Sequence, residues 1–259
     1  MKIGIIAALD GELQKIIDHI DNPKVVTHVM REFHMGRYFD HEVVAVISRI
    51  GKVAAATTTT LLIEKFNVDA IVMIGVAGAI GKDLKRGDIV VGTSLVQHDM
   101  DASPIFPRHE IPLLSKVNFE CNKAMIAGAK KAVKEFLKED LEAFVSDEVL
   151  KELHLDKPVL HTGVIASGDL FMKTKKDVEK LRKRLPDVVC VEMEGAAVAQ
   201  IAYEFQIPAV VIRIISDGAD EDATHNFSTF MRKFASHLCY GVMDRFLENP
   251  LEKLYEPIQ

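Results

Sequence analysis

Carboxylates that follow apolar segments are the residues of this 259-residue chain best suited to do chemistry. Glu12 follows the apolar run that opens the chain, and Asp217 follows another such run, Ala209 to Ile215. Ligands of open α/β sheets bind beyond the carboxyl ends of strands, so side chains at these places are candidates for a site. Taken alone, Glu12 is better explained as a solvated carboxylate in the first turn of a helix.

Further charges interrupt apolar sequence close to Asp217. Glu192 and Glu194 break the passage Val188 to Val198, and Arg213 lies inside the run that ends before Ser216 and Asp217. A buried charge without a partner is costly, so these groups need one another or a ligand. A structural ion pair between Glu192 and Arg213 is one interpretation. Two carboxylates and an arginine at strand ends favour a functional site.

Two segments that follow strands have the composition of ligand-binding loops. Gly75 to Gly81 predicts a glycine-rich turn, in which Gly78 would let a ligand approach the backbone. Its spacing lacks the GxGxxG pattern of dinucleotide-binding sites, and a tight turn without a ligand is an equal alternative. Ser167 to Met172 carries Phe171, which could stack on a flat purine, with core packing as the alternative.

The elements that would position these residues alternate between strands and helices. Short runs rich in Val and Ile predict buried strands, and segments with three- or four-residue periodicity predict helices. We expect an α/β fold with three layers, α/β/α, around a largely parallel or mixed sheet. The predicted strands are Ile3 to Ala8, Val43 to Ile47, Ala70 to Ile74, Ile89 to Val96, Val159 to Ala166, Val188 to Val191 and Ala209 to Ile215, and the predicted helices are Lys52 to Phe66, Asn118 to Leu137, Lys175 to Leu185, Glu194 to Phe205 and His225 to Leu247.

Composition limits the class of protein. Residues 1 to 259 are expected to form a single domain, with Ser115 to Pro158 as a solvated helical excursion. A net charge of −6 argues against nucleic acid as a partner, and the opening apolar run is too short for a signal peptide or membrane span. Three separated cysteines indicate reduced thiols in the cytoplasm, and ten scattered histidines give no metal-binding spacing.

At these residues the chain resembles the 5′-methylthioadenosine/S-adenosylhomocysteine nucleosidases of the nucleoside phosphorylase superfamily. The combination of VEMEG with ISDGAD is specific to that family. The resemblance implies a mixed, twisted central sheet, a homodimer, no cofactor and no metal. It implies hydrolysis that releases adenine from these two nucleosides, with 5′-deoxyadenosine as a further candidate substrate. The matching segments are KIGIIAALDGEL at the start, IGKVAAATTTTLL from Ile50, IGVAGAI from Ile74, GDIVV from Gly87, HDMDAS from His98, IASGDLF from Ile165, VEMEGAAVA from Val191 and VIRIISDGAD from Val211.

The resemblance also assigns roles to individual residues. Asp217 is the expected acid that protonates the purine, oriented by Ser216, and Glu12 is the expected base that activates water. Asp217 then has to hold a proton at neutral pH, which burial or neighbouring negative charge favours. The other expected substrate-binding residues are Glu194 at the ribose hydroxyls, Met193 against the sugar, Arg213 near the water and sugar, Phe171 stacked on the base, the backbone of Met172 at the adenine edge, and Phe227 beside the 5′ substituent.

Departures from the family pattern concern the water site at Val76, the sugar pocket at Leu9 and the contacts to the 5′ substituent. Val76 stands where many relatives have a serine, Leu9 replaces a methionine, and Pro104 to Pro107 differs within Ala102 to Leu114, the segment expected to close the site of a neighbouring subunit. Related phosphorylases have an arginine at the position of Met73 and a hydroxyl at that of Val76. Phosphorolysis stays an alternative because Arg49 could supply a charge. Aminofutalosine hydrolysis is a second alternative, and a nucleoside-binding protein without catalysis is a third.

Overall fold

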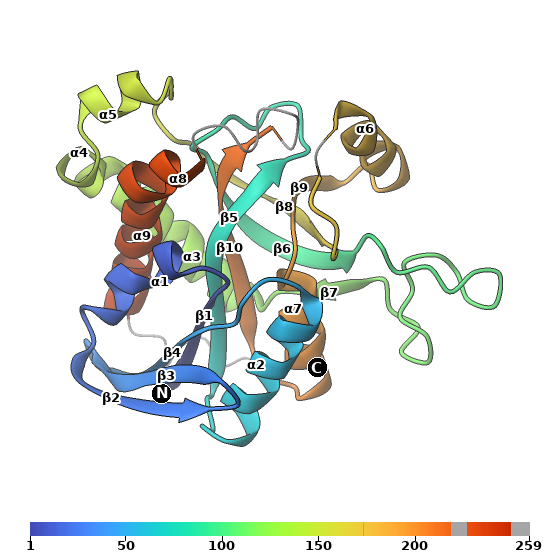
Figure 1. Cartoon of the computed structure of the whole chain (residues 1–259), viewed down its shortest axis with the longest axis horizontal. Coiled ribbons are helices and arrows are strands. Elements are labelled where there is room, and N and C mark those ends of the chain that lie inside the picture. The colour runs from blue at the N-terminus through green and yellow to red at the C-terminus, as the bar shows by residue number, and fades with distance from the viewer. Residues whose placement is uncertain (173, 219–226, 250–259) are drawn as a thin grey trace.

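The computed structural model describes residues 1–172, 174–218 and 227–249. Its strands belong to one mixed sheet in the order β10-β6-β8-β9-β5-β1-β4-β3-β2, and β7 pairs with β6 (Figure 1). The strands are β1 (Lys2–Ala7), β2 (Asp21–His28), β3 (Arg31–Tyr38), β4 (His41–Ile47), β5 (Ala70–Ala79), β6 (Ile89–Gln97), β7 (Asn118–Glu120), β8 (Leu160–Ser167), β9 (Val188–Glu192) and β10 (Ala209–Asp217).

One half of the sheet closes on itself. β10 pairs antiparallel with β6 on one side and parallel with β5 on the other, so β10, β6, β8, β9 and β5 form a ring. β1, β4, β3 and β2 extend the sheet from β5 as an open, twisted wing. β9 runs against β5 and meets it near the ends of both strands, where Val191 pairs with Gly78. The carboxyl ends of two oppositely directed sets of strands therefore converge.

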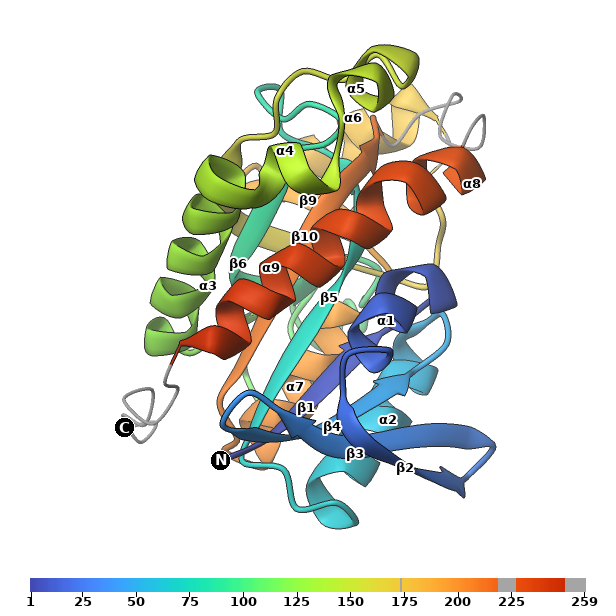
Figure 2. The same cartoon turned by 90° about the vertical axis from the view of Figure 1, so that its left-hand side faces the viewer.

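Helices cover both faces of the sheet. α1 and α3 pack against the long C-terminal helix α9 on one side, and α2 packs against α7 on the other (Figure 2). This arrangement confirms the predicted mixed-sheet α/β fold with helices on both sides; the single domain stays a prediction. The helices are α1 (Asp10–Ile17), α2 (Lys52–Glu64), α3 (Lys123–Glu135), α4 (Leu141–Phe144), α5 (Asp147–Glu152), α6 (Lys175–Arg184), α7 (Gly195–Glu204), α8 (Phe227–Phe230) and α9 (Ser236–Glu248), with π-helical turns at η1 (Phe136–Asp140) and η3 (Met231–Ala235).

The apolar stripe of the C-terminal segment is buried as its periodicity predicts. Its side chains from Phe230 to Phe246 face the sheet with no exposed surface, and the helix changes pitch at the π-helical turn η3. The predicted helix start at His225 lies outside the described residues. The fully buried members of the stripe are Phe230, Phe234, Leu238, Val242 and Phe246.

Several local predictions were wrong. The hairpin of β2 and β3 was not predicted, because exposed residues line much of β2 and remove the apolar signal. Asn118–Glu120 is strand β7 rather than the start of a helix. The stretch from Ser115 to Pro158 is not a solvated excursion throughout, because one face of α3 is buried against α9 and the sheet.

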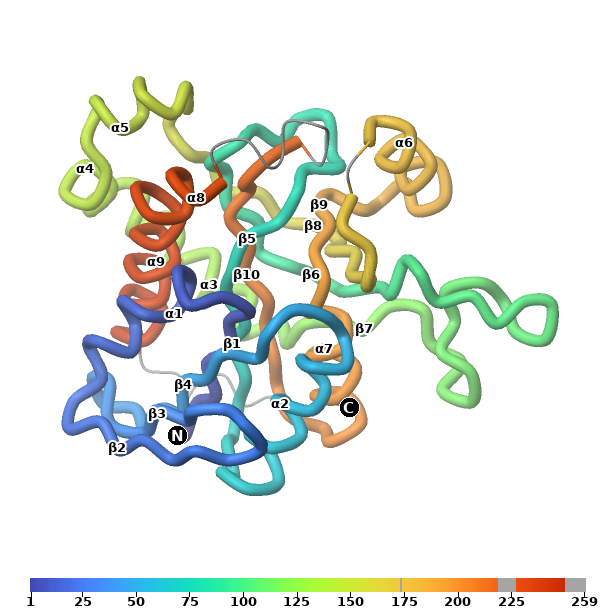
Figure 3. The backbone as a smooth tube through the Cα atoms, in the orientation of Figure 1, coloured from blue at the N-terminus to red at the C-terminus, as the bar shows by residue number. Residues whose placement is uncertain are grey.

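A long arm leaves the body of the protein between β6 and β7. Residues 98–117 form a double loop that projects away from the sheet (Figure 3), and the arm carries Ile105 and Leu113, which are 82% and 90% exposed. The three cysteines, Cys121, Cys190 and Cys239, are buried and unpaired. No helix in the described part of the chain is long and apolar enough to cross a membrane.

Candidate active site

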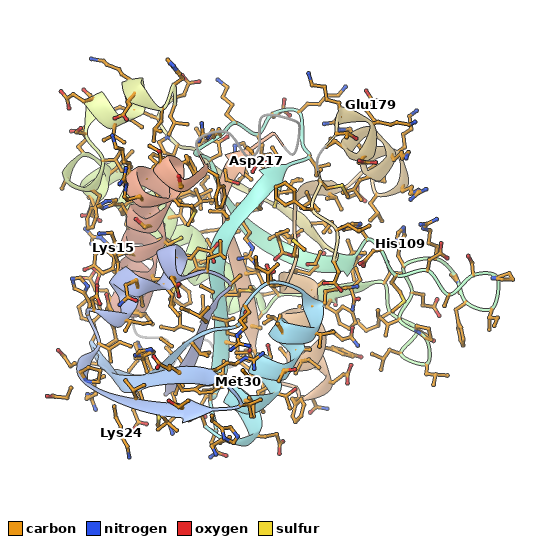
Figure 4. The ribbon with its side chains drawn as sticks, viewed as in Figure 1. Lys15, Lys24, Met30, His109, Glu179 and Asp217 are labelled. Carbon is orange, nitrogen blue, oxygen red and sulfur yellow. The ribbon has the colours of Figure 1, made fainter. Side chains whose placement is uncertain are left out.

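A cavity of about 290 Å³ opens where the strand ends converge. Figure 4 places Asp217 at this end of β5 and β10. The walls come from β5, β9 and β10, from the starts of α1 and α8, and from the segments that follow β1, β4, β8 and β9. The lining residues are Ala8, Leu9, Glu12, Ile50, Val76, Ala77, Gly78, Leu170, Phe171, Met172, Val191, Glu192, Met193, Glu194, Ser216, Asp217 and Phe227.

Glu12 is buried in the first turn of α1, where its carboxylate is held by three backbone amides. Oε2 accepts the N–H groups of Ala8 and Leu9, each at 2.9 Å, and Oε1 accepts that of Val76 at 2.9 Å. Burial raises the pKa of Glu12, while Arg213 and the three amides oppose this shift. Its side chain is only 3% exposed, so the interpretation as a solvated carboxylate is wrong. A fixed carboxylate with a raised pKa suits a general base near neutral pH.

Gly75 belongs to strand β5, so the predicted glycine-rich turn is wrong: β5 continues to Ala79. The glycine is needed for space rather than for a turn. A β-carbon at Gly75 would lie 2.5 Å from Nη1 of Arg213 and 2.7 Å from Oε1 of Glu12. Arg213 is the cross-strand neighbour of Gly75. Its guanidinium therefore lies on one side of this gap and the Glu12 carboxylate on the other.

The ion pair between Glu192 and Arg213 does form, and both side chains are almost wholly buried. Arg213 also contacts Sδ of Met73 at 3.2 Å. Glu192 accepts the N–H groups of Glu194 and Gly195 at 3.0 and 2.8 Å. Arg213 itself is 1% exposed and does not line the cavity. Its charge lies against Glu192 and near Glu12, and its predicted place near the water and sugar stays a prediction.

Glu194 stands at the start of α7 with its carboxylate in the cavity. Oε1 accepts the backbone N–H of Gly51 at 2.8 Å, which ties it to the segment before α2. Burial and the neighbouring Glu192 raise the pKa of Glu194 to about 7, against the lowering effect of Arg213. This carboxyl group can therefore accept or donate hydrogen bonds at neutral pH.

A β-bulge places Asp217 at the end of β10. Ile215 pairs with Ala77 and Asp217 pairs with Gly78, so Ser216 is the extra residue. Bulges next to active sites re-aim a side chain. The Ser216 hydroxyl donates to Oδ2 of Asp217 and lies 3.3 Å from the carbonyl oxygen of Ala77. The serine therefore fixes the direction of the carboxyl group.

The loop after β8 carries the aromatic wall and is anchored by a polar network that sequence reasoning missed. The backbone N–H of Asp169 donates to Asp99 at 2.9 Å, and Oδ1 of Asp169 accepts the N–H of Lys52 at 2.8 Å. Nζ of Lys52 bonds Asp99 at 2.6 Å. Phe171 lines the cavity and is 49% exposed, so it is not a core residue. Asp99 belongs to the segment from His98 that matches the family, but its spacing in the sequence did not indicate that it would contact Lys52 and Asp169.

All the predicted site residues except Arg213 line this one cavity. Leu9, Ile50 and Leu170 add apolar walls that the site assignment left out. No group of three or more His, Cys, Asp or Glu residues in the described ranges could hold a metal ion. The arrangement supplies two carboxyl groups of different environment, Glu12 and Asp217, around a space of nucleoside size.

Comparison with known proteins gives the same family as the motifs. Residues 2–248 match the family model of the phosphorylase superfamily. The 5′-methylthioadenosine/S-adenosylhomocysteine nucleosidase of Maridesulfovibrio salexigens is 36% identical over 86% of this chain and 89% of the relative. That of Bacillus subtilis is 33% identical over 92% of this chain and 94% of the relative. This chain belongs to that nucleosidase family.

Solved structures agree. The nucleosidase of Colwellia psychrerythraea in complex with adenine superposes with a TM-score of 0.84 at 33% identity, covering 96% of this chain and 95% of the other. A futalosine hydrolase of Helicobacter pylori superposes with a TM-score of 0.81 at 34% identity, covering 96% and 98%. The fold therefore extends over nearly the whole chain in both comparisons.

Within the phosphorylase superfamily, the side chains near Glu12 distinguish this nucleosidase site from a phosphate site. Val76 lines the cavity without a hydroxyl group, and Met73 offers only a sulfur, which faces Arg213. Arg49 does not line this cavity. Phosphate binding requires several donors in a fixed geometry, and these residues provide none.

Proposed function

We propose that the chain hydrolyses the N-glycosidic bond of 5′-methylthioadenosine and S-adenosylhomocysteine, releasing adenine and the 5-thio-substituted ribose. The observation that carries this proposal is the single cavity that presents Glu12, Glu194 and Asp217 together. Glycoside cleavage passes through an oxocarbenium-like sugar, so it needs an acid at the leaving group and a base at the water. Membership of the nucleosidase family identifies adenine as the leaving group.

Asp217 is assigned as the acid. It would protonate adenine at a ring nitrogen, with the Ser216 hydroxyl orienting the carboxyl group. Phe171 would stack on the purine, the backbone of Met172 would read its amino-substituted edge, and Gly78 would admit it close to the strand. Stacking of aromatic groups contributes about 0.5–1.5 kcal/mol beyond area burial. Protonation makes adenine a neutral, better leaving group.

Glu12 is assigned as the base. Three backbone amides fix its carboxylate, and burial with a raised pKa strengthens its basicity toward a bound water. Glu194 would bind the ribose hydroxyls, while Met193 packs against the sugar and Phe227 walls the 5′ substituent. The negative charge of these carboxylates also favours the cationic sugar of the transition state.

The principal alternative is hydrolysis of aminofutalosine, which is favoured by the likeness to the Helicobacter pylori futalosine hydrolase. It uses the same bond cleavage with a different 5′ substituent. Phosphorolysis is a weaker alternative, because neither Met73 nor Val76 offers an oxygen or nitrogen donor.

We further infer that two copies form a dimer and that the enzyme acts in the cytoplasm. The arm carries exposed apolar side chains, Ile105 and Leu113, and a second exposed apolar group lies beside the cavity at Ile50 and Val53. Large exposed apolar groups favour an interface. The arm of one copy would cover the cavity of the other. Three unpaired cysteines are compatible with a reducing compartment.

Adenine release from 5′-methylthioadenosine in phosphate-free buffer tests the proposal. Formation of adenine and a reducing sugar, unchanged when phosphate is added, is the expected result. Inosine and aminofutalosine are the control substrates. Activity that requires phosphate, or faster cleavage of aminofutalosine than of the thioadenosine, would replace the proposal by the corresponding alternative.

A further inference from the structure

A second cavity of about 570 Å³ adjoins the active-site cavity. The two share three wall residues, Ala8, Leu9 and Ile50. The remaining walls come from α1, the tip of the β2–β3 hairpin and the end of β4, and Figure 4 labels Met30 at that tip, beside α2. The charged side chains that line the first cavity are all carboxylates, whereas this one contains both signs: Asp10, Arg31, Glu32 and Arg49.

Two arginines without carboxylate partners lie together in this cavity. Nε of Arg31 donates to the Thr58 hydroxyl at 2.8 Å, Nη1 to the Val29 carbonyl at 2.9 Å and Nη2 to the Ala54 carbonyl at 3.4 Å, so one N–H of each terminal nitrogen remains for a ligand. Burial, with the nearby charge of Arg49, lowers the pKa of Arg31. In the described part of the chain, carboxylates pair with Arg108, Arg213 and Arg245 but with neither of these two. Adjacent guanidinium groups repel unless an anion lies between them.

Arg49 occupies a backbone conformation that normally favours glycine. Its φ is 74°, in the left-handed region, where a side chain costs free energy. The Arg49 guanidinium donates from Nη2 to the carbonyl oxygen of Met30, at the tip of the hairpin. That single bond uses one of its donors, and the others stay available to the cavity. The backbone strain at Arg49 therefore costs free energy, and one hydrogen bond to the Met30 carbonyl offsets only part of that cost.

The 5′ substituent of a bound nucleoside would point toward this second cavity. In the proposed function, the purine lies between Asp217 and Phe171, and the ribose lies at Glu12 and Glu194. The walls that remain for the 5′ substituent are apolar, and Leu9 and Ile50 among them also border the second cavity. A substituent several atoms long would therefore pass these two residues and reach the arginines.

We propose that Arg31 and Arg49 form a subsite for the carboxylate end of a long 5′ substituent. The inference rests on the proposed function and assigns two residues of this chain that would favour a substrate with a charged tail over one with a short, uncharged tail. Guanidinium groups bind carboxylates through paired, charge-assisted hydrogen bonds. Asp10 and Glu32 line the same cavity, and their negative charges would attract an ammonium group. An amino-acid tail, as in S-adenosylhomocysteine, carries both charges.

The test compares two synthetic 5′-thioethers of adenosine: one whose tail ends in a butanoate carboxylate, and the matching uncharged amide. We expect the wild-type kcat/KM to favour the carboxylate by about tenfold, because charged hydrogen bonds discriminate at this level. In Arg49→Gln the ratio should fall toward one, and in Arg49→Lys it should be partly retained. High salt should also reduce the wild-type ratio, because both charges are partly exposed.

Arg37→Gln is the matched control, because Arg37 is an exposed arginine of β3 that lines neither cavity. It should keep the wild-type ratio. If Arg49→Gln unfolds, Arg49→Gly suits the local φ and replaces it. No preference in the wild type, or an unchanged ratio in the Arg49 variants, overturns the proposal. If the two arginines bind free phosphate instead, added phosphate should change kcat/KM equally for both substrates, and the wild type should show no preference for the carboxylate. Cleavage of 5′-methylthioadenosine tests the proposed function separately.

Discussion

One methyl group at Gly75 should remove most of the activity while the fold survives. The added carbon of Gly75→Ala would lie 2.5 Å from the Arg213 guanidinium and 2.7 Å from the Glu12 carboxylate. Ordinary contacts need about 3.4 Å, so these two groups must together give way by roughly an ångström. A displacement of that size at a catalytic group costs about 10²-fold in rate. Overpacking of this kind lowers the free energy of unfolding by about 1–3 kcal/mol.

The assay is kcat for adenine release from 5′-methylthioadenosine, together with the urea midpoint of each variant. Gly11→Ala is the matched control. It adds the same atom beside Glu12, where the nearest neighbour is Cε of Met231 at 3.4 Å, and it should raise stability by up to about 1 kcal/mol, since alanine favours helix. A Gly75→Ala enzyme within threefold of wild type, roughly 0.7 kcal/mol in barrier, would refute the idea that this gap positions the base.

Four further predictions follow from the same site. Asp217→Asn should lower kcat by about 10²–10⁴-fold with substrate still bound, measured by turnover and equilibrium binding; near-normal kcat would remove it as the acid. Glu192→Gln removes the carboxylate that is hydrogen-bonded to the buried Arg213, while Glu12 and Glu194 still offset its charge in part, so the free energy of unfolding should fall by at most about 3–5 kcal/mol in urea titrations, and a loss below about 1 kcal/mol would contradict this. Because the folded pKa of Glu194, about 7, exceeds its usual value of 4.5, the folded state binds the extra proton between these values. The stability of wild type relative to Glu194→Gln should therefore decline by roughly 2–3 kcal/mol as pH rises from 4.5 to 7, and a flat or rising difference would exclude the shift. Leu113→Asp should convert the proposed dimer to monomer in light-scattering measurements, whereas a monomeric wild type would refute the dimer itself.

The sequence predicted the strands that carry the site because those strands are buried on both faces. Continuous Val and Ile runs, as in Ala209 to Ile215, give an unambiguous signal, and the polar residues that follow them mark the cavity. Glu12 was the residue for which sequence and environment disagreed. A carboxylate in the first turn of a helix is usually solvated, and this one is buried because distant segments, among them Val76 of β5 and Arg213 of β10, lie against it.

The features that sequence could not predict depend on contacts between distant segments. The closure of β10 onto both β5 and β6 follows no local pattern, since it is set by how the whole sheet curls. Gly75 was interpreted as a turn residue because glycine commonly marks turns, whereas here it makes room for two charges within a strand. The second cavity was equally hidden, because Arg31 at the start of β3 and Arg49 in the segment after β4 meet only after folding.

The charges around the cavity suggest why the unliganded site suits a cationic transition state. Glu12, Glu192 and Glu194 are all buried near one buried cation, Arg213, so the cluster has more carboxylates than positive charge. Burial of that excess raises the pKa of both Glu12 and Glu194. A sugar that develops positive charge would balance part of this excess negative charge and so lower the free-energy cost of burying it. In the proposed function, this arrangement would stabilise the transition state more than the neutral substrate, and such a difference accelerates bond cleavage.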